Sequence, residues 1–265
     1  ITLDDSKLQF VSIQDIGGEN NLLEANITPL MADSGDDIDP RLATISPDGE
    51  KIVALRINRE TNIDSICIYR FSSNATTCTD IGENFPRFTG GFWSPDSRYV
   101  VLNTDVEALM YMNECDVMIY DTQENRLINR TDDGVGSDEK LIDEGIRERA
   151  WVDLAPIFAP NGDLYFLRNA IDPTVDEWRA DLMRIPASEI TGASAPEVIL
   201  RHPSDVPFPT FRTSGWQLDG SVSISPNGQY LAYSAMTQNT DDPNNGVWII
   251  DLTQKSVKVH IPTAR

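Results

Sequence analysis

Short apolar runs, each about four residues long, recur along this chain in a fixed order around a repeated turn phrase. The phrase reads Ile-Ser-Pro-Asp-Gly at 45–49, Trp-Ser-Pro-Asp-Ser at 93–97, Phe-Ala-Pro-Asn-Gly at 158–162 and Ile-Ser-Pro-Asn-Gly at 224–228. Proline presets the second position of a tight turn, Asp or Asn suits the third, and glycine takes the left-handed position that follows. Because apolar residues flank each phrase, every copy predicts a β-hairpin.

Two further apolar runs follow each hairpin and predict a second pair of strands. These runs are 66–69 with 76–78, 117–120 with 127–128, 182–185 with 198–200, and 247–250 with 257–259. Each unit is then four antiparallel strands, which we name A to D in chain order. Four-stranded units repeated along a chain are typical of β-propeller blades. An all-β sandwich with similar turns is the alternative, and four copies with one strand order argue against it.

We expect an all-β fold with one β-propeller domain over residues 1–265. Its predicted parts are a half blade at 1–29, complete blades at 40–82, 88–131, 152–202 and 218–262, and an acidic insertion at 132–151. The half blade contains two strand-like runs, 8–13 and 22–27, which resemble a C–D hairpin without its A and B strands. We therefore expect a segment of a larger ring. A five-bladed ring with a degenerate first blade is the alternative.

The turn phrase, the apolar strand after it, and strands that end in Tyr120-Asp121 or Ile250-Asp251 resemble the repeat of TolB-type (WD40-like) β-propellers. The segment from Arg126 to Thr131 is similar to the end of strand D in that family. The resemblance covers residues 42 to 262 approximately. It implies the propeller fold and an extracytoplasmic location, since such propellers occur in periplasmic and surface binding proteins. They also occur as the non-catalytic domain of some serine peptidases and lyases.

The chain is strongly acidic, with 42 Asp and Glu against 21 Lys and Arg and a net charge of −21. Nucleic acids and anionic membranes need a positive surface, so we expect neither as a partner. The charge favours cations or a basic protein partner. No apolar run approaches the ~18–20 residues of a membrane span, and no feature of the sequence selects an oligomeric state.

Three cysteines and three glycosylation sequons bear on the compartment. Cys67 on strand C and Cys78 on strand D lie symmetrically about the connection 72–74, which predicts directly opposed residues and allows a disulfide. Two free buried thiols are the alternative, and Cys115 has no evident partner. A disulfide would indicate an oxidising compartment. The sequons begin at Asn26, Asn74 and Asn129, on or beside the outer D strands.

Strand alternation places the B–C and D–A connections on one face of a propeller, and here they are long and acidic. Long loops on a rigid scaffold often carry binding sites, so this is our candidate binding face. Its candidate residues are Asp33, Asp36, Asp37, Asp39, Asp132, Asp133, Asp143, Glu144 and the aromatic anchors Trp151, Trp178 and Trp216. Within the insertion, the pattern predicts a helix at 138–149 that covers this face. A decorated loop is the alternative.

We expect no cofactor and no metal. The oxygens at 33–39 alternate but lack the twelve-residue EF-hand loop, which leaves a single Ca²⁺ among the acidic loops as an alternative. His202 and His260 do not stand at zinc-ligand spacing with the cysteines.

No Gly-x-Ser-x-Gly elbow, phosphate loop or dinucleotide fingerprint occurs, so we identify no catalytic residue. The leading interpretation is a non-catalytic module that presents its acidic face to a protein partner, within a surface or membrane-associated assembly. The alternative is the propeller domain of a peptidase or of a carbohydrate-active lyase or hydrolase whose catalytic part lies elsewhere.

Overall fold

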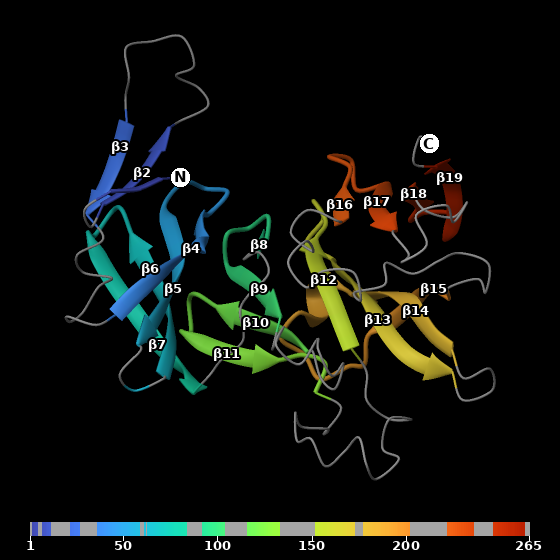
Figure 1. Ribbon diagram of the computed structural model, residues 1–265, viewed down its shortest axis with the longest axis horizontal. Helices are drawn as coiled ribbons and strands as arrows, with labels where there is room; N and C mark the ends of the chain where they lie inside the picture. Colours follow the sequence, from blue (N-terminus) through green and yellow to red (C-terminus); the bar gives the residue numbers. More distant parts are fainter. Residues whose placement is uncertain are drawn as a thin grey trace. The chain divides into compact units, whose positions relative to one another are not determined.

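The computed structural model describes residues 2–4, 7–11, 22–26, 36–58, 61, 63–83, 92–103, 116–132, 152–172, 177–201, 222–235 and 246–262. These residues form β-strands joined by tight turns (Figure 1). The chain divides into two compact units. Unit 1 is Ile1–Phe85 with Asp121–Arg126, and unit 2 is Pro86–Tyr120 with Leu127–Arg265.

Four of the sheets have four strands hydrogen-bonded in the order in which they follow along the chain. Blade 1 is β4 Asp36–Ile45, β5 Lys51–Asn58, β6 Ile63–Arg70 and β7 Ala75–Glu83. Blade 2 is β8 Phe92–Trp93, β9 Tyr99–Asn103, β10 Val117–Asp121 and β11 Arg126–Asn129. Blade 3 is β12 Val152–Phe158, β13 Leu164–Asp172, β14 Glu177–Ile185 and β15 Glu197–Arg201, with the short 3₁₀ helix η4 Ala187–Glu189 before β15. Blade 4 is β16 Val222–Ile224, β17 Tyr230–Ala235, β18 Gly246–Asp251 and β19 Ser256–Pro262. The predicted all-β fold with four complete propeller blades is confirmed.

The N-terminal sheet has three strands, β1 Thr2–Asp4, β2 Lys7–Val11 and β3 Leu22–Asn26, in that order. The hairpin of β2 and β3 matches the prediction. The structure adds a third strand to it, since β1 pairs antiparallel with β2. Three residues are too short a run to show the two-residue alternation by which a strand is recognised in sequence.

The turn phrase forms the same A–B hairpin turn in blades 1, 2 and 4. In blade 1 the Ser46 hydroxyl donates to Asp48 and accepts from the Lys51 amide, while the Asp48 carboxylate accepts from the Glu50 amide. The last residue of the phrase is left-handed, with φ of 74° at Gly49 and 59° at Ser97. The Asp or Asn of the phrase therefore serves the turn, as the sequence predicted, and the structure shows that the Ser does so too.

Blade 3 has alanine where the other phrases have serine, and its turn is one residue tighter. The Ala159 amide donates to the Asp163 carbonyl, whereas the Ser46 amide reaches across five residues to Lys51. Without the hydroxyl, the side chain of Asn161 bonds to Asp163, since Asn161 Nδ2 donates to Asp163 Oδ2 at 2.9 Å. The Asp163 carboxylate also accepts from the Ala187 amide and pairs with Arg184 at 2.9 Å. As a result, Leu164 takes the place that the fifth residue after proline has in the other blades.

Unit 2 has a hydrophobic core on each side of blade 3. Toward blade 2, Phe166 and Ile185 pack with Val101, Val117 and Ile119. Toward blade 4 the core contains Tyr165, Leu167, Leu182, Ile199, Leu231, Tyr233, Trp248 and Ile250. Strand β12 lies against β8 and β16, so the first strands of these three blades adjoin one another.

Unit 1 has a separate core on one side of blade 1. It contains Ala43, Ile52, Ala54, Cys67 and Tyr69, with Ile45, Phe71 and Cys78 packed against it. The side chain of Arg70 donates to the Thr122 carbonyl at 2.8 Å, which joins the turn at 121–126 to blade 1 within this unit.

Candidate functional site

Most of the predicted acidic face lies outside the described residues. This holds for the helix at 138–149 and for Asp33, Asp133, Asp143, Glu144, Trp151 and Trp216. Asp132 is described and is exposed directly after the end of blade 2. Trp178 lies on β14 opposite Ile171 in the ladder with β13, and only its backbone is described. The binding role of these residues stays a prediction.

The placement of Asp36, Asp37 and Asp39 in a loop is wrong. Strand β4 begins at Asp36, and these residues pair with Asn58, Ile57 and Leu55 of β5. The ladder is irregular between Asp39 and Thr44, where the sequence has Pro40. Proline cannot donate a ladder hydrogen bond and is accommodated at such irregularities, which is why the sequence pattern suggested a later start.

A buried ion pair lies at the long-loop end of blade 3, the end to which the B–C and D–A connections attach. Arg168 Nε donates to Asp153 Oδ1 and Arg168 Nη2 donates to Asp153 Oδ2, both at 2.7 Å. Asp153 is 0% exposed and Arg168 is 9% exposed. Two parallel bonds match the planar fork of the guanidinium to the carboxylate, the strongest geometry for this pair.

A second buried carboxylate, Asp116, lies beside this pair at the start of β10. Asn129 Nδ2 donates to Asp116 Oδ2 at 2.7 Å, and the Thr131 hydroxyl lies 3.3 Å from Asp116 Oδ1. The Thr131 hydroxyl oxygen also accepts from the Val117 amide at 2.8 Å. We call the buried residues Asp116, Thr131, Asp153 and Arg168, together with the exposed Asn129 that bonds to Asp116, the buried polar network.

Burial raises the pKa of Asp153 to about 6, from an ordinary value of 3.8, because a low-dielectric surrounding disfavours the charged form. The hydrogen bond and charge of Arg168, together with a hydrogen bond from Thr131, lower this pKa, while the charge of Asp116 raises it. Asp153 is therefore mostly ionised at neutral pH, although its pKa lies closer to neutral pH than is usual for a carboxylate bound to arginine.

Alternating charges continue from this pair across blade 3. Asp153 pairs with Arg168, Arg168 with Asp181 and Asp181 with Arg201 in successive strand ladders. Opposite charges directly across a ladder are stabilising. Sequence reasoning missed this row and the buried polar network. Their signal was a charged residue within an otherwise apolar strand, as Asp153 is within Val152–Phe158.

The buried polar network joins the two ends of the insertion at 132–151. Thr131 directly precedes the insertion, Asp153 follows it after one residue, and a hydrogen bond between these two side chains contributes to the pKa of Asp153. The network thus fixes where the acidic insertion leaves and re-enters the blades. Since the carboxylates are buried and hydrogen-bonded to protein groups, the arrangement is one of anchoring.

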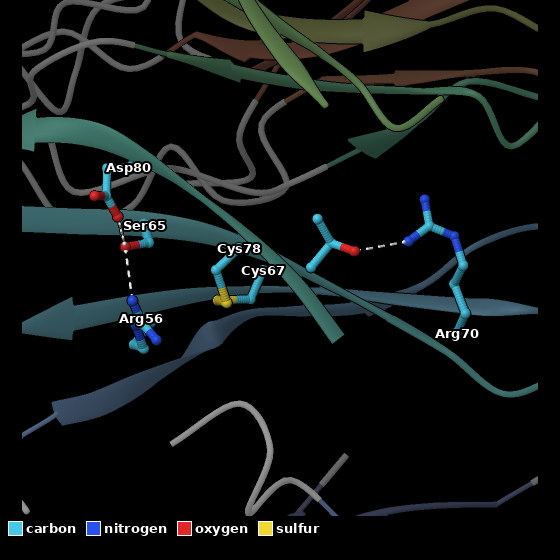
Figure 2. Close-up of a disulfide and its surroundings, with 7 residues drawn as sticks. Arg56, Ser65, Cys67, Arg70, Cys78 and Asp80 are labelled. Atoms are coloured by element: carbon cyan, nitrogen blue, oxygen red, sulfur yellow. Dashed lines mark hydrogen bonds between the residues drawn. A yellow bond between two sulfur atoms is a disulfide. The ribbon is translucent and has the colours of Figure 1, made fainter. Parts of the chain in front are cut away.

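Blade 1 has a smaller polar cluster at its own long-loop end (Figure 2). Arg56 Nη2 donates to the Ser65 hydroxyl at 3.3 Å, and that hydroxyl donates to Asp80 Oδ1 at 2.8 Å. The three residues stand opposite one another on β5, β6 and β7. Polar side chains thus pair across the strands at this end of blades 1 and 3.

Cys67 and Cys78 form a disulfide between β6 and β7, with 4.1 Å between their Cα atoms (Figure 2). They are directly opposite in the ladder, as the sequence predicted. The pair belongs to the core of unit 1. Cys115 lies outside the described residues.

The sequon asparagines differ in what their amides contact. Asn74 is exposed at a turn with φ of 50°, and its Oδ1 accepts from the Tyr69 hydroxyl at 2.6 Å. The Asn129 amide belongs to the buried polar network, as described above. For Asn26 the structure describes only the backbone, at the end of β3. Glycosylation of these residues stays a prediction.

Among the side chains that the structure describes, no three His, Cys, Asp or Glu residues gather in a way that could hold a metal ion. The acidic loops considered for Ca²⁺ are largely outside those residues. No helix in the part of the chain described is long and apolar enough to cross a membrane.

No protein-family model matches this sequence, and no curated protein matches it. Several solved structures are similar in fold. Porphyromonas gingivalis dipeptidyl peptidase 4 is 12% identical with a TM-score of 0.55, over 92% of this chain and 35% of the peptidase. An oligogalacturonate lyase in complex with manganese is 13% identical with a TM-score of 0.51, over 84% of this chain and 53% of the lyase. The β-propeller domain of the Trilobed protease from Pyrococcus furiosus is 14% identical with a TM-score of 0.45, over 95% of this chain and 65% of that domain. The chain spans less than two thirds of each of these proteins, and the likeness shows the fold alone.

Proposed function

We propose that this chain is a non-catalytic, extracytoplasmic interaction module of the TolB type, which presents an acidic long-loop face to a basic protein partner. The observation that carries this proposal is the buried polar network at both ends of the insertion at 132–151. A network of buried ionic groups is costly to build, and here it joins the two ends of the most acidic long insertion of the chain.

The charge of the insertion supports a basic partner. Residues 132–151 hold seven acidic and three basic side chains, within a chain of net charge −21. Fixing both ends of a loop lowers the entropy it loses on binding, and a field of one sign raises the rate of association with an oppositely charged surface. The disulfide between Cys67 and Cys78 supports the extracytoplasmic location, since disulfides persist in oxidising compartments.

The test compares two variants of equal charge change. The first replaces three acids of the insertion, Asp133→Asn, Asp143→Asn and Glu144→Gln. The control replaces three exposed acids at the tight-turn end of the blades, Glu50→Gln, Glu124→Gln and Glu197→Gln. Binding of an oligo-lysine peptide is measured by titration calorimetry at low and at physiological salt.

We expect the insertion variant to bind the peptide at least tenfold more weakly than the unmodified protein, and the control variant to bind nearly as well. Equal losses in the two variants would contradict the proposal, because they would show attraction by overall charge rather than by a defined face.

A second candidate is the propeller domain of a peptidase or a carbohydrate-active enzyme. The similarity in fold to a dipeptidyl peptidase and to an oligogalacturonate lyase favours it. The test is to treat the protein isolated from its source with a fluorophosphonate probe of serine hydrolases and to assay it on oligogalacturonate. Labelling or cleavage would support this candidate, and neither would argue against these two activities.

A further inference from the structure

Within the part of the chain that the structure describes, blade 4 has one side covered by a neighbouring blade and one side left uncovered. Its covered side contributes Leu231, Tyr233, Trp248 and Ile250 to the core shared with blade 3. On the other side, Ala232, Ile249 and Val259 lie opposite one another across three strands, and Val247 lies opposite Ile261. We call these five residues the open face.

The open face exposes large aliphatic side chains. Val247 is 39% exposed, Val259 is 40% exposed and Ile261 is 51% exposed. Apart from Val198, no large hydrophobic residue among those described is as exposed. The corresponding side of blade 3 is buried, with Tyr165, Leu167 and Leu182 between 3% and 7% exposed. A contiguous apolar patch of this kind marks an interaction surface.

The repeat indicates which structure covers this side. The corresponding residues of blade 2, Val101, Val117 and Ile119, are 0% exposed because Phe166 and Ile185 of blade 3 pack against them. Blade 3 is covered in turn by blade 4. In both established interfaces, the apolar side of one blade is buried by the next four-stranded blade.

The charge near the open face indicates which kind of surface would bind there. Residues 252–262 contain Lys255, Lys258 and His260 and no Asp or Glu, within a chain of net charge −21. Lys255 lies in the turn before β19, Lys258 lies on β19, and both are exposed. An acidic rim on the occupant would complement these charges.

We propose that the open face docks a further four-stranded blade with an aliphatic side and an acidic rim, in the way that blade 4 docks on blade 3. The surface is distinct from the acidic long-loop face. The docked blade would bury Val247, Val259 and Ile261 and bring carboxylates to Lys255 and Lys258.

The first experiment compares the protein isolated from its source with the recombinant chain of residues 1–265. Side-chain footprinting with hydroxyl radicals should label Val259 and Ile261 several-fold less in the source protein. Zero-length carbodiimide cross-linking should join Lys258 to Asp or Glu of a strand outside these 265 residues that belongs to a blade with the turn phrase. Equal labelling of the two samples would overturn the proposal.

Cross-links also separate the other occupants. A link from Lys258 to Asp4 or Glu24 of the same molecule would show closure by the N-terminal sheet and would overturn the proposal. A link between isotopically distinct copies would show a dimer and would also overturn it. A variant with Val259→Lys and Ile261→Lys should lose the protection and the cross-link. The control Gln254→Lys with Thr253→Lys, at exposed positions of the adjoining turn, should keep both.

Discussion

Arg168 is the residue on which the buried polar network depends. It provides both hydrogen bonds to a carboxylate that is 0% exposed. Replacing Arg168 with methionine keeps the length of the side chain but leaves Asp153 buried without its counter-charge. We expect Arg168→Met to lower the free energy of unfolding of unit 2 by about 3–5 kcal/mol, the usual cost of breaking a buried pair.

The measurement is urea unfolding followed by tryptophan fluorescence, because all five tryptophans belong to unit 2. The double variant Arg168→Met with Asp153→Leu should recover a large part of the loss, since neither charge of the pair is left buried without the other. The single variant Asp153→Leu completes the comparison. If the loss of stability in the double variant equals the sum of the losses in the two single variants, the two side chains act independently.

Asp153 also gives unit 2 a specific pH dependence. Its pKa is raised by burial to about 6 in the folded protein, against an ordinary 3.8, so the folded state binds this proton more tightly than the unfolded chain. The stabilising contribution is complete below about pH 4 and is lost as the pH rises through about 6. We expect the stability of the unmodified protein, relative to Asp153→Asn, to fall between pH 4 and pH 7.

This pH dependence is measured as the difference in urea midpoint between the two proteins at each pH, again by tryptophan fluorescence. The comparison is needed because other carboxylates act in the opposite sense. Hydrogen bonds from Thr253 and Gln254 lower the pKa of Asp251, for example. A difference that stays constant from pH 4 to pH 7 would show that Asp153 does not titrate in this range.

At the scale of single elements, the disulfide connects adjacent strands of blade 1 and should stabilise unit 1 alone. Replacing both Cys67 and Cys78 with alanine removes a closed loop of eleven residues in sequence separation. The entropy of loop closure predicts a loss of about 3 kcal/mol. We expect faster amide hydrogen exchange in β6 and β7, with exchange in β13 and β14 unchanged as the internal control. Equal acceleration in both units would mean that the units unfold together.

The blades could be predicted from sequence because their information is local. Each hairpin is specified by a few neighbouring residues, such as Ser46 and Asp48, whose side chains bond to the turn itself. The register of Cys67 with Cys78 follows from the same local symmetry. Strand β4 was placed too late because Pro40 and three aspartates resemble a loop, although their backbone pairs with β5.

The buried polar network could not be predicted in the same way. Asp116 directly precedes β10 and Thr131 follows β11 in blade 2, whereas Asp153 lies on β12 of blade 3. Only the packing of blades 2 and 3 brings Asp153 to the other two. A charged residue in an apolar strand indicates a buried pair, but it does not identify the partner. Most residues of the predicted binding face lie outside the described ranges, so the prediction of that face rests on the sequence alone.

At the scale of the whole molecule, the net charge of −21 opposes the compact state, because like charges repel more strongly when the chain is folded. Salt screens this repulsion over about 10 Å at 0.1 M. We therefore expect the urea midpoint to rise when NaCl increases from 10 mM to 150 mM. The rise should be smaller in the insertion variant Asp133→Asn, Asp143→Asn and Glu144→Gln, which carries three fewer negative charges.

Sulfate and chloride salts at equal ionic strength distinguish screening from other effects of salt. Screening depends on ionic strength, whereas sulfate additionally strengthens the burial of apolar surface. If the two salts raise the urea midpoint equally at equal ionic strength, self-repulsion is supported as the cause. An increase seen only with sulfate would point instead to apolar surface, and the open face of blade 4, with Ile261 51% exposed, would be the first place to look for its origin.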